Sequence, residues 1–186
     1  MTEQIPTAPS GQTSSLGTPI DTAAVRRLAQ NVDDGAVTTA DAGHRKEILA
    51  LLDGALATEL LCVLRYKRHY HTAVGLTNTA IKDEFLEHAQ EEQAHADEIA
   101  ERIVQLNGEP DFNPATLAGR SHAEYDESTD IKSMIRANLV AERVAIESYR
   151  QMIAKIGDLD PTTTLMLTRI LAKEEEHADE MRDLLG

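Results

Sequence analysis

A glutamate followed three residues later by a histidine occurs twice in this chain. The first pair is Glu92 and His95, the second is Glu174 and His177, and Ala-Asp-Glu follows each histidine. Three residues correspond to about 300° of rotation on a helix, so each carboxylate lies one turn from its imidazole on the same side. A carboxylate and an imidazole that converge on one point are suitable ligands for a metal ion such as iron. The repetition predicts a metal site with internal pseudo-symmetry.

Four long helices must position these residues, because four segments carry apolar stripes with alternating spacings of four and three. We expect them over about 44–73, 79–107, 130–156 and 161–185. The first and last links are short, and Asp160 suits the N-cap of the last helix. The link over 108–129 is long enough to run the length of a bundle. This order predicts an all-α four-helix bundle with a long crossover between helices 2 and 3, on its outside.

The N-terminal part of the chain has a different composition. Residues 1–42 are rich in Thr, Ser, Pro and Gly and predict a partly flexible arm, with a short helix over 21–32 that Asp21 can cap. Residues 43–186 are predicted to form the bundle domain. Aromatic residues make up only 3% of the sequence, which favours helices over strands.

Each of the four apolar stripes also contains one glutamate: Glu59, Glu92, Glu142 and Glu174. The two glutamates that lack a following histidine have a tyrosine seven residues later, Tyr66 and Tyr149. Two helical turns place each tyrosine on the stripe of the glutamate before it. Because 33 residues separate the first two glutamates and 32 the last two, antiparallel helices place all four at similar depth.

Four carboxylates inside a bundle cannot stay ionised and unpaired, because burial of each charge costs several kcal/mol. No Lys or Arg lies in the central part of any stripe. Two divalent cations would balance the four charges, and oxygen with nitrogen ligands favours iron or manganese over structural zinc. The simpler alternative is a polar network that fixes helix register, or glutamates that face solvent. The coincidence of all four motifs favours the metal site.

Bulk properties narrow the function further. The net charge of −14 argues against nucleic acid and anionic membranes as partners. The single cysteine, Cys62, rules out a disulfide framework or a thiolate cluster within the chain. The sequence shows neither an apolar run of membrane-span length nor a secretory signal, so we expect a cytoplasmic protein.

The stretches Ile99–Pro110 and Ile170–His177 resemble the bacterioferritins of the ferritin-like superfamily, and the resemblance extends over about residues 44–186. It implies that six residues are the di-iron ligands: Glu59, Glu92, His95, Glu142, Glu174 and His177. In that family Glu92 and Glu174 would bridge the two irons, and Glu59 and Glu142 would each hold one. Tyr66 would lie beside the ligands, and both Tyr66 and Tyr149 are candidates to hydrogen-bond them or to donate an electron.

The chain departs from the bacterioferritin pattern at two places. Gln93 occupies the position of the methionine that binds haem in bacterioferritins, so we predict no haem through that ligand. The N-terminal extension and the connection over 112–125 look more like the Dps-like branch that keeps a bacterioferritin-type site. That branch forms twelve-subunit shells but has a cysteine pair near the metal, whereas Cys62 stands alone. A homo-oligomeric shell of twelve is favoured, with twenty-four as the alternative.

The resemblance implies a ferroxidase that oxidises Fe(II) with O2 or H2O2 and stores the Fe(III) mineral. The alternatives are a di-manganese catalase, a rubrerythrin-like peroxidase and a non-enzymatic metal-buffering shell. His88 and Asn138 lie four residues before Glu92 and Glu142. They could form a polar path for Fe(II) entry, or they could be buried polar groups with satisfied hydrogen bonds. The second interpretation is favoured. Arg65 and His69 are interpreted as part of a solvated end of the first helix.

Overall fold

The structure, a computed structural model, describes residues 20–38, 43–73 and 79–186. Within these ranges the chain forms helices and connections: α1 (Thr22–Leu28), α2 (Arg45–Thr72), α3 (Thr79–Gln105), α4 (Leu117–Arg120), α5 (Ile131–Ile156), the 3-10 turn η2 (Gly157–Leu159) and α6 (Pro161–Asp183). The all-α prediction is confirmed. None of the described helices is long and apolar enough to span a membrane.

The chain divides into two compact units, Met1–Gln30 and Asn31–Gly186. In the first unit, α1 coincides with the short helix predicted over 21–32, and the Asp21 carboxylate caps it by accepting from Ala24 N at 3.0 Å. The arm up to residue 19 and the short link between the first two long helices, over 74–78, lie outside the described residues. The domain boundary at residue 43 stays a prediction.

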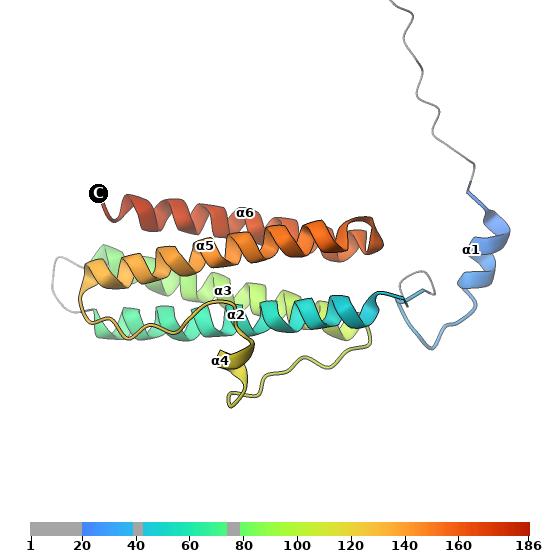
Figure 1. Cartoon of the computed structure of the whole chain (residues 1–186), viewed down its shortest axis with the longest axis horizontal. Coiled ribbons are helices and arrows are strands. Elements are labelled where there is room, and N and C mark those ends of the chain that lie inside the picture. The colour runs from blue at the N-terminus through green and yellow to red at the C-terminus, as the bar shows by residue number, and fades with distance from the viewer. Residues whose placement is uncertain (1–19, 39–42, 74–78) are drawn as a thin grey trace, which may run out of the picture. The chain divides into compact units, whose positions relative to one another are not determined.

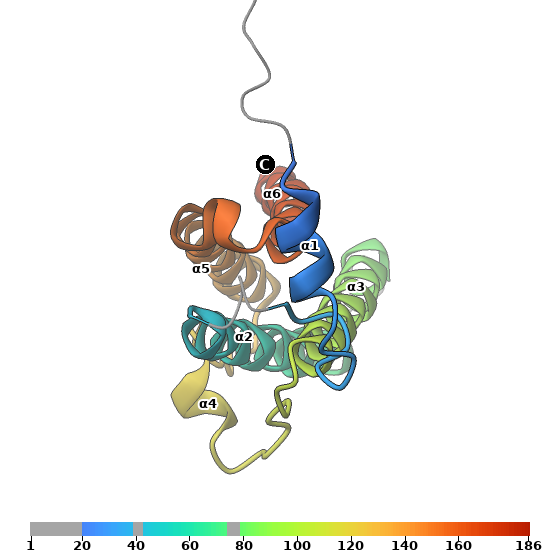
Figure 2. The same ribbon diagram turned by 90° about the vertical axis from the view of Figure 1, so that its right-hand side faces the viewer.

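In the second unit, α2 packs antiparallel to α3, and α5 packs antiparallel to α6 (Figure 1). Seen end-on, the four helices surround one core (Figure 2). The connection between α3 and α5 runs back along the outside of α2 and contains α4 (Figure 1). The predicted four-helix bundle with one long crossover is therefore confirmed.

Side-chain caps begin the helices of the second hairpin. The Asp130 carboxylate accepts from Ser133 N at 2.9 Å and starts α5. The Asp160 carboxylate accepts from Thr163 N at 3.0 Å, with Pro161 at the first helical position of α6. Asp160 also accepts from the Arg102 guanidinium at 2.8 Å, which ties α3 to the start of α6.

The crossover is fixed to the outer face of α2 by polar contacts. The Arg120 guanidinium donates to Asp53 Oδ1 at 2.9 Å, and His122 N donates to Thr58 Oγ1 at 2.9 Å. Gly54 permits this approach, because a Cβ there would lie 2.9 Å from His122 Nε2. Helix α2 is thus covered on two sides, by the bundle and by the crossover.

This cover explains why the sequence interpretation of Arg65 and His69 is wrong. We predicted a solvated end of the helix, but both residues are fully buried. His69 Nε2 lies 3.1 Å from Asp126 Oδ1 of the crossover. The apolar stripe of α2 marks only the face toward the other helices, whereas an irregular segment without a periodic pattern covers the outer face.

Among the described residues, buried apolar side chains form three clusters, the smallest of which is Cys62, Ala123 and Ala141. The two larger clusters fill the bundle core. One includes Leu52, Ile99 and Leu167, and the other includes Phe85 and Met181. The predicted glutamates lie in a buried polar layer along the same helices.

Candidate metal centre

Each long helix contributes one glutamate to the polar layer: Glu59 from α2, Glu92 from α3, Glu142 from α5 and Glu174 from α6. None of the four is more than 1% exposed. His95 and His177 come from the helical turns that follow Glu92 and Glu174. The His177 side chain is fully buried, and the His95 side chain is 12% exposed. The structure therefore brings all six predicted residues together.

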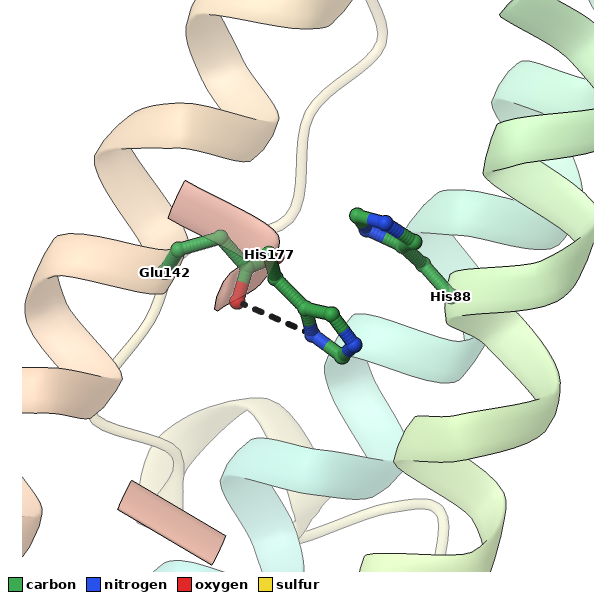
Figure 3. A group of neighbouring side chains, drawn as sticks. All are labelled: His88, Glu142 and His177. Atoms are coloured by element: carbon green, nitrogen blue, oxygen red, sulfur yellow. Dashed lines mark ion pairs between the residues drawn. The ribbon is translucent and has the colours of Figure 1, made fainter. Parts of the chain in front are cut away.

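The six residues form two groups of four whose ligand atoms lie within 4.8 Å of one another. Glu59 and His95 belong only to the first group, and Glu142 and His177 only to the second, whereas Glu92 and Glu174 belong to both. His95 Nδ1 lies 2.9 Å from Glu174 Oε1 and 3.4 Å from Glu59 Oε2. His177 Nδ1 lies 3.9 Å from Glu142 Oε2 (Figure 3). The geometry defines two candidate cation positions that share two carboxylates.

Eight buried oxygen and nitrogen atoms surround these two positions, and none of them has a hydrogen-bond partner. They are Glu59 Oε2, Glu142 Oε2, both carboxylate oxygens of Glu92 and Glu174, and Nδ1 of His95 and His177. Leaving a buried polar atom without a partner costs about 1–3 kcal/mol. Carboxylate oxygens and imidazole nitrogens are ligands for Fe(II) or Mn(II), so the residues present fit a pair of divalent cations.

The other oxygens of Glu59 and Glu142 accept from tyrosines in a crosswise arrangement. Tyr66 of α2 donates to Glu142 Oε1 of α5, and Tyr149 of α5 donates to Glu59 Oε1 of α2. Burial, followed by repulsion from these carboxylates, raises the pKa of both phenols well above its usual value, so both remain donors. Each tyrosine thus leaves one oxygen of its glutamate free to face a cation and ties α2 to α5.

Without bound metal, some side chains of the buried polar layer keep protons at a pH where they would lose them in water. Burial, and then repulsion from neighbouring carboxylates, raises the pKa of Glu92 and Glu174 well above the usual value. Burial alone would raise the pKa of Glu59, but the neighbouring Glu92 carboxyl group, the His95 ring and the Tyr149 hydroxyl outweigh burial and leave that pKa lowered. Burial lowers the pKa of His95, but Glu174 and Glu59 outweigh it and raise the pKa to about 10. Divalent cations would replace these protons on binding.

Comparison with known proteins gives the family. The ferritin-like domain family matches residues 49–186. The chain belongs to the ferritin-like family. The resemblance to bacterioferritins and their Dps-like branch is confirmed, and membership implies iron as the metal.

This ferritin-like chain is 30% identical over 143 residues to a DNA protection during starvation protein from Pyrococcus furiosus, covering 75% of the chain and 77% of that protein. It is 28% identical over 130 residues to a nutrient stress-induced DNA-binding protein from a Synechococcus species, covering 68% and 74%. Among solved structures, the bacterioferritin-related protein from Bacteroides fragilis, described as a dodecameric thioferritin, superposes with a TM-score of 0.73. It is 33% identical and the match covers 76% of this chain and 85% of that one.

The prediction that nucleic acid is not a partner is wrong, because two of these relatives are named for DNA binding or DNA protection. The exclusion used only the net charge of −14. A net charge sums over the whole chain, whereas phosphate contacts depend on where cationic side chains gather. A net charge alone therefore does not exclude DNA as a partner.

A carboxylate orients the outer nitrogen of His177 in this ferritin-like site. His177 Nε2 lies 2.7 Å from Glu91 Oε2, and Lys173 Nζ lies 3.2 Å from Glu91 Oε1. Such a carboxylate fixes the ring and leaves Nδ1 for the metal. Sequence reasoning missed Glu91, although a glutamate on α3 next to a stripe position can reach α6.

Two residues at which the chain departs from the bacterioferritin pattern are Gln93 and Cys62. Gln93 Nε2 donates to Asp97 Oδ1 at 2.9 Å on the exposed side of α3, and the absence of haem stays a prediction. Cys62 is a buried free cysteine, and burial raises the pKa of its thiol to about 12.

His88 and Asn138 are both buried beside the layer. Both ring nitrogens of His88 have partners, as the favoured interpretation expects. Asn138 Oδ1 accepts from Arg65 Nε at 2.9 Å, whereas Asn138 Nδ2 has no partner. Arg65, a buried guanidinium next to Tyr66 on α2, is a cation close to the carboxylates that the stripe pattern does not reveal.

We expect Arg65→Met to destabilise the protein by about 2–4 kcal/mol, because it removes charged hydrogen bonds to Asn138 and to the crossover. Urea unfolding of the metal-free protein measures this change. The matched control is Lys67→Met on the same helix, where the side chain is exposed and the expected change is within about 0.5 kcal/mol. Equal stability of the two variants would contradict the structural role of Arg65.

Proposed function

We propose that this ferritin-like protein is a ferroxidase that oxidises Fe(II) with O2 or H2O2 and stores the Fe(III) product in a homo-oligomeric shell. One observation carries the proposal: two four-ligand groups share Glu92 and Glu174. Shared carboxylates hold two ions side by side, so that both can give electrons to one oxidant molecule. The six predicted residues are proposed as the ligands of these ions, with Fe(II) as substrate.

In the proposed reaction, two Fe(II) each lose one electron, and O2 takes both electrons and two protons to become H2O2. With H2O2 as oxidant, the same two electrons and two protons yield two waters. Glu59 and Glu142 each hold one ion, while Tyr149 and Tyr66 fix the orientation of these carboxylates by hydrogen bonds. The buried layer keeps bulk water away and fixes the ligand geometry before the ions bind.

The assembly belongs to the same proposal. A shell of twelve chains is supported by the Bacteroides fragilis relative, which is described as dodecameric. Because other relatives are named for DNA, the assembled shell is also a candidate DNA-binding particle, which a gel-shift assay on linear DNA tests directly. The cytoplasmic location stays a prediction.

Aerobic addition of two Fe(II) per chain to the metal-free protein is expected to give Fe(III) absorbance much faster than in buffer. One O2 should be consumed for each pair of Fe(II). Preloading with Zn(II), which binds similar ligands but cannot change redox state, should suppress the reaction and serves as the control.

Oxidation no faster than in buffer would contradict the ferroxidase proposal. Rapid breakdown of H2O2 by the Mn(II)-loaded protein would then favour the catalase or peroxidase alternative. Metal binding without either activity would favour the buffering shell.

A further inference from the structure

A second cluster of ligand-type side chains lies beside the candidate centre, toward the N-terminal end of α3. It consists of Glu84 and His88 of α3 and Glu180 of α6, and their ligand atoms lie within 4.8 Å of one another. His88 Nε2 lies 2.9 Å from Glu180 Oε2 and 3.7 Å from Glu84 Oε1. The Glu84 and Glu180 side chains are 31% and 40% exposed, whereas the His88 side chain is 1% exposed. Two carboxylates that solvent can reach thus meet one buried imidazole.

The hydrogen bonds around His88 indicate which of its nitrogens is available. Tyr66 has one hydroxyl hydrogen and donates it to Glu142 Oε1. The 3.0 Å contact between Tyr66 Oη and His88 Nδ1 therefore requires Nδ1 to be the donor. Nε2 is the nitrogen that faces the two carboxylates, with Glu180 Oε2 as its hydrogen-bond partner at 2.9 Å. A cation bound by these three side chains would take the place of that hydrogen bond.

The cluster also continues inward to the two-ion centre. His88 forms another ligand group with Glu142 and His177, again within 4.8 Å (Figure 3). The rings of His88 and His177 stack with centroids 4.0 Å apart. His177 Nδ1 and Glu142 Oε2, both buried, have no hydrogen-bond partner. Ligand atoms therefore continue from partly exposed carboxylates, through His88, to the atoms that would hold the second ion.

We propose that Glu84, His88 and Glu180 form a third divalent-cation site, through which Fe(II) reaches the two-ion centre. The transfer step rests on the proposed ferroxidase function, whereas cation binding at this site does not. Three ligands and access to solvent suit an ion that exchanges, in contrast to the fully buried carboxylates of the centre. No bond other than metal–ligand bonds changes in this step, and the ion stays Fe(II).

Zn(II) binding to the full-length protein tests the site without redox chemistry. We expect three Zn(II) per wild-type chain and two per chain in the Glu84→Gln/Glu180→Gln variant. The matched control Asp83→Asn/Glu87→Gln removes the same charge from exposed positions of α3 and should bind three. Anomalous diffraction from Zn(II)-soaked crystals should place the third ion against His88 Nε2. Three ions in the first variant, or two in the wild type, would overturn the site.

The rate of iron oxidation tests the transfer. At Fe(II) concentrations below saturation, the Glu84→Gln/Glu180→Gln variant should show an initial rate several-fold below that of wild type and control, with the same final yield of Fe(III). An unchanged rate in a variant that has lost its third Zn(II) would overturn the transfer. A wild-type chain that binds three Zn(II) but does not oxidise Fe(II) would contradict the proposed function and still support the site.

Discussion

Replacing Glu92 with glutamine is expected to abolish ion binding at both positions of the centre, whereas Glu59→Gln is expected to lose only one. Glu92 contributes ligand atoms to both groups of four, and Glu59 contributes to one. The amide keeps the shape of the side chain but removes a charge and one oxygen ligand. Glu174→Gln should behave like Glu92→Gln, and Glu142→Gln like Glu59→Gln. Metal analysis after Co(II) or Zn(II) loading measures the difference.

The same variants should oxidise Fe(II) at least about 100-fold more slowly, because loss of an outer contact to a ligand already costs 10–100-fold and a direct ligand should cost no less. Glu101→Gln, at an exposed position of α3, is the matched control and should keep the wild-type rate. Equal metal content in Glu92→Gln and Glu59→Gln would show that the two positions do not share Glu92.

Unfolding cannot account for such a loss, because Glu92→Gln should stabilise the metal-free protein. Burial and neighbouring carboxylates raise the pKa of Glu92 well above its usual value, so above pH 4.5 the metal-free fold must keep a proton there that the unfolded chain releases. A neutral amide of the same shape is free of this cost. The variant should thus unfold at higher urea concentration than the metal-free wild type while it binds less metal.

The positions of the candidate ligands could be predicted from the sequence because helical periodicity places them on the apolar stripes. Glu59, Glu92, Glu142 and Glu174 each interrupt an apolar stripe, and a stripe that must face a core leaves such a side chain no other direction. Short links within each hairpin and matched intervals then set their depth. These are local properties of the chain, and the structure shows the same six residues together.

The side chains that hydrogen-bond or surround the candidate ligands could not be predicted, because their positions depend on contacts between helices. The sequence placed Tyr66 on the stripe of Glu59, but its hydroxyl donates to Glu142 across the bundle. Arg65 was assigned to solvent because the crossover that buries it has no periodic pattern. The cluster around His88 needs α3 and α6 in register, since its carboxylates are 96 residues apart.

Removing the metal is expected to make stability fall as pH rises from about 6.5 to 9, while the Zn(II)-loaded protein changes little. In the folded protein Glu92 and Glu174 keep their protons above the ordinary pKa of 4.5, so the folded state binds more protons than the unfolded chain. The free energy of unfolding then decreases as pH rises. His95 acts in the same direction: its stabilisation is complete below 6.5 and is lost as pH rises toward a pKa of about 10.

Two of the candidate ligands act with the opposite sign but outside this window. The lowered pKa of Glu59 adds stability that is lost only as pH falls through 4.5 and below. The lowered pKa of His177, which burial causes, costs stability only below 6.5. Above that pH, the His95 contribution alone amounts to at most a few kcal/mol, at about 1.4 kcal/mol for each tenfold change in proton affinity.

Urea unfolding of metal-free and Zn(II)-loaded protein between pH 6.5 and 9 measures this effect. The difference between the two forms should widen with pH, because bound cations replace the protons that the metal-free site must give up. Glu92→Gln removes one of the responsible groups, so its metal-free form should show a shallower decline. If the free energy of unfolding of the metal-free protein stays level or rises over this range, the prediction is wrong. Positive side chains, rather than retained protons, would then balance the charge of the buried carboxylates.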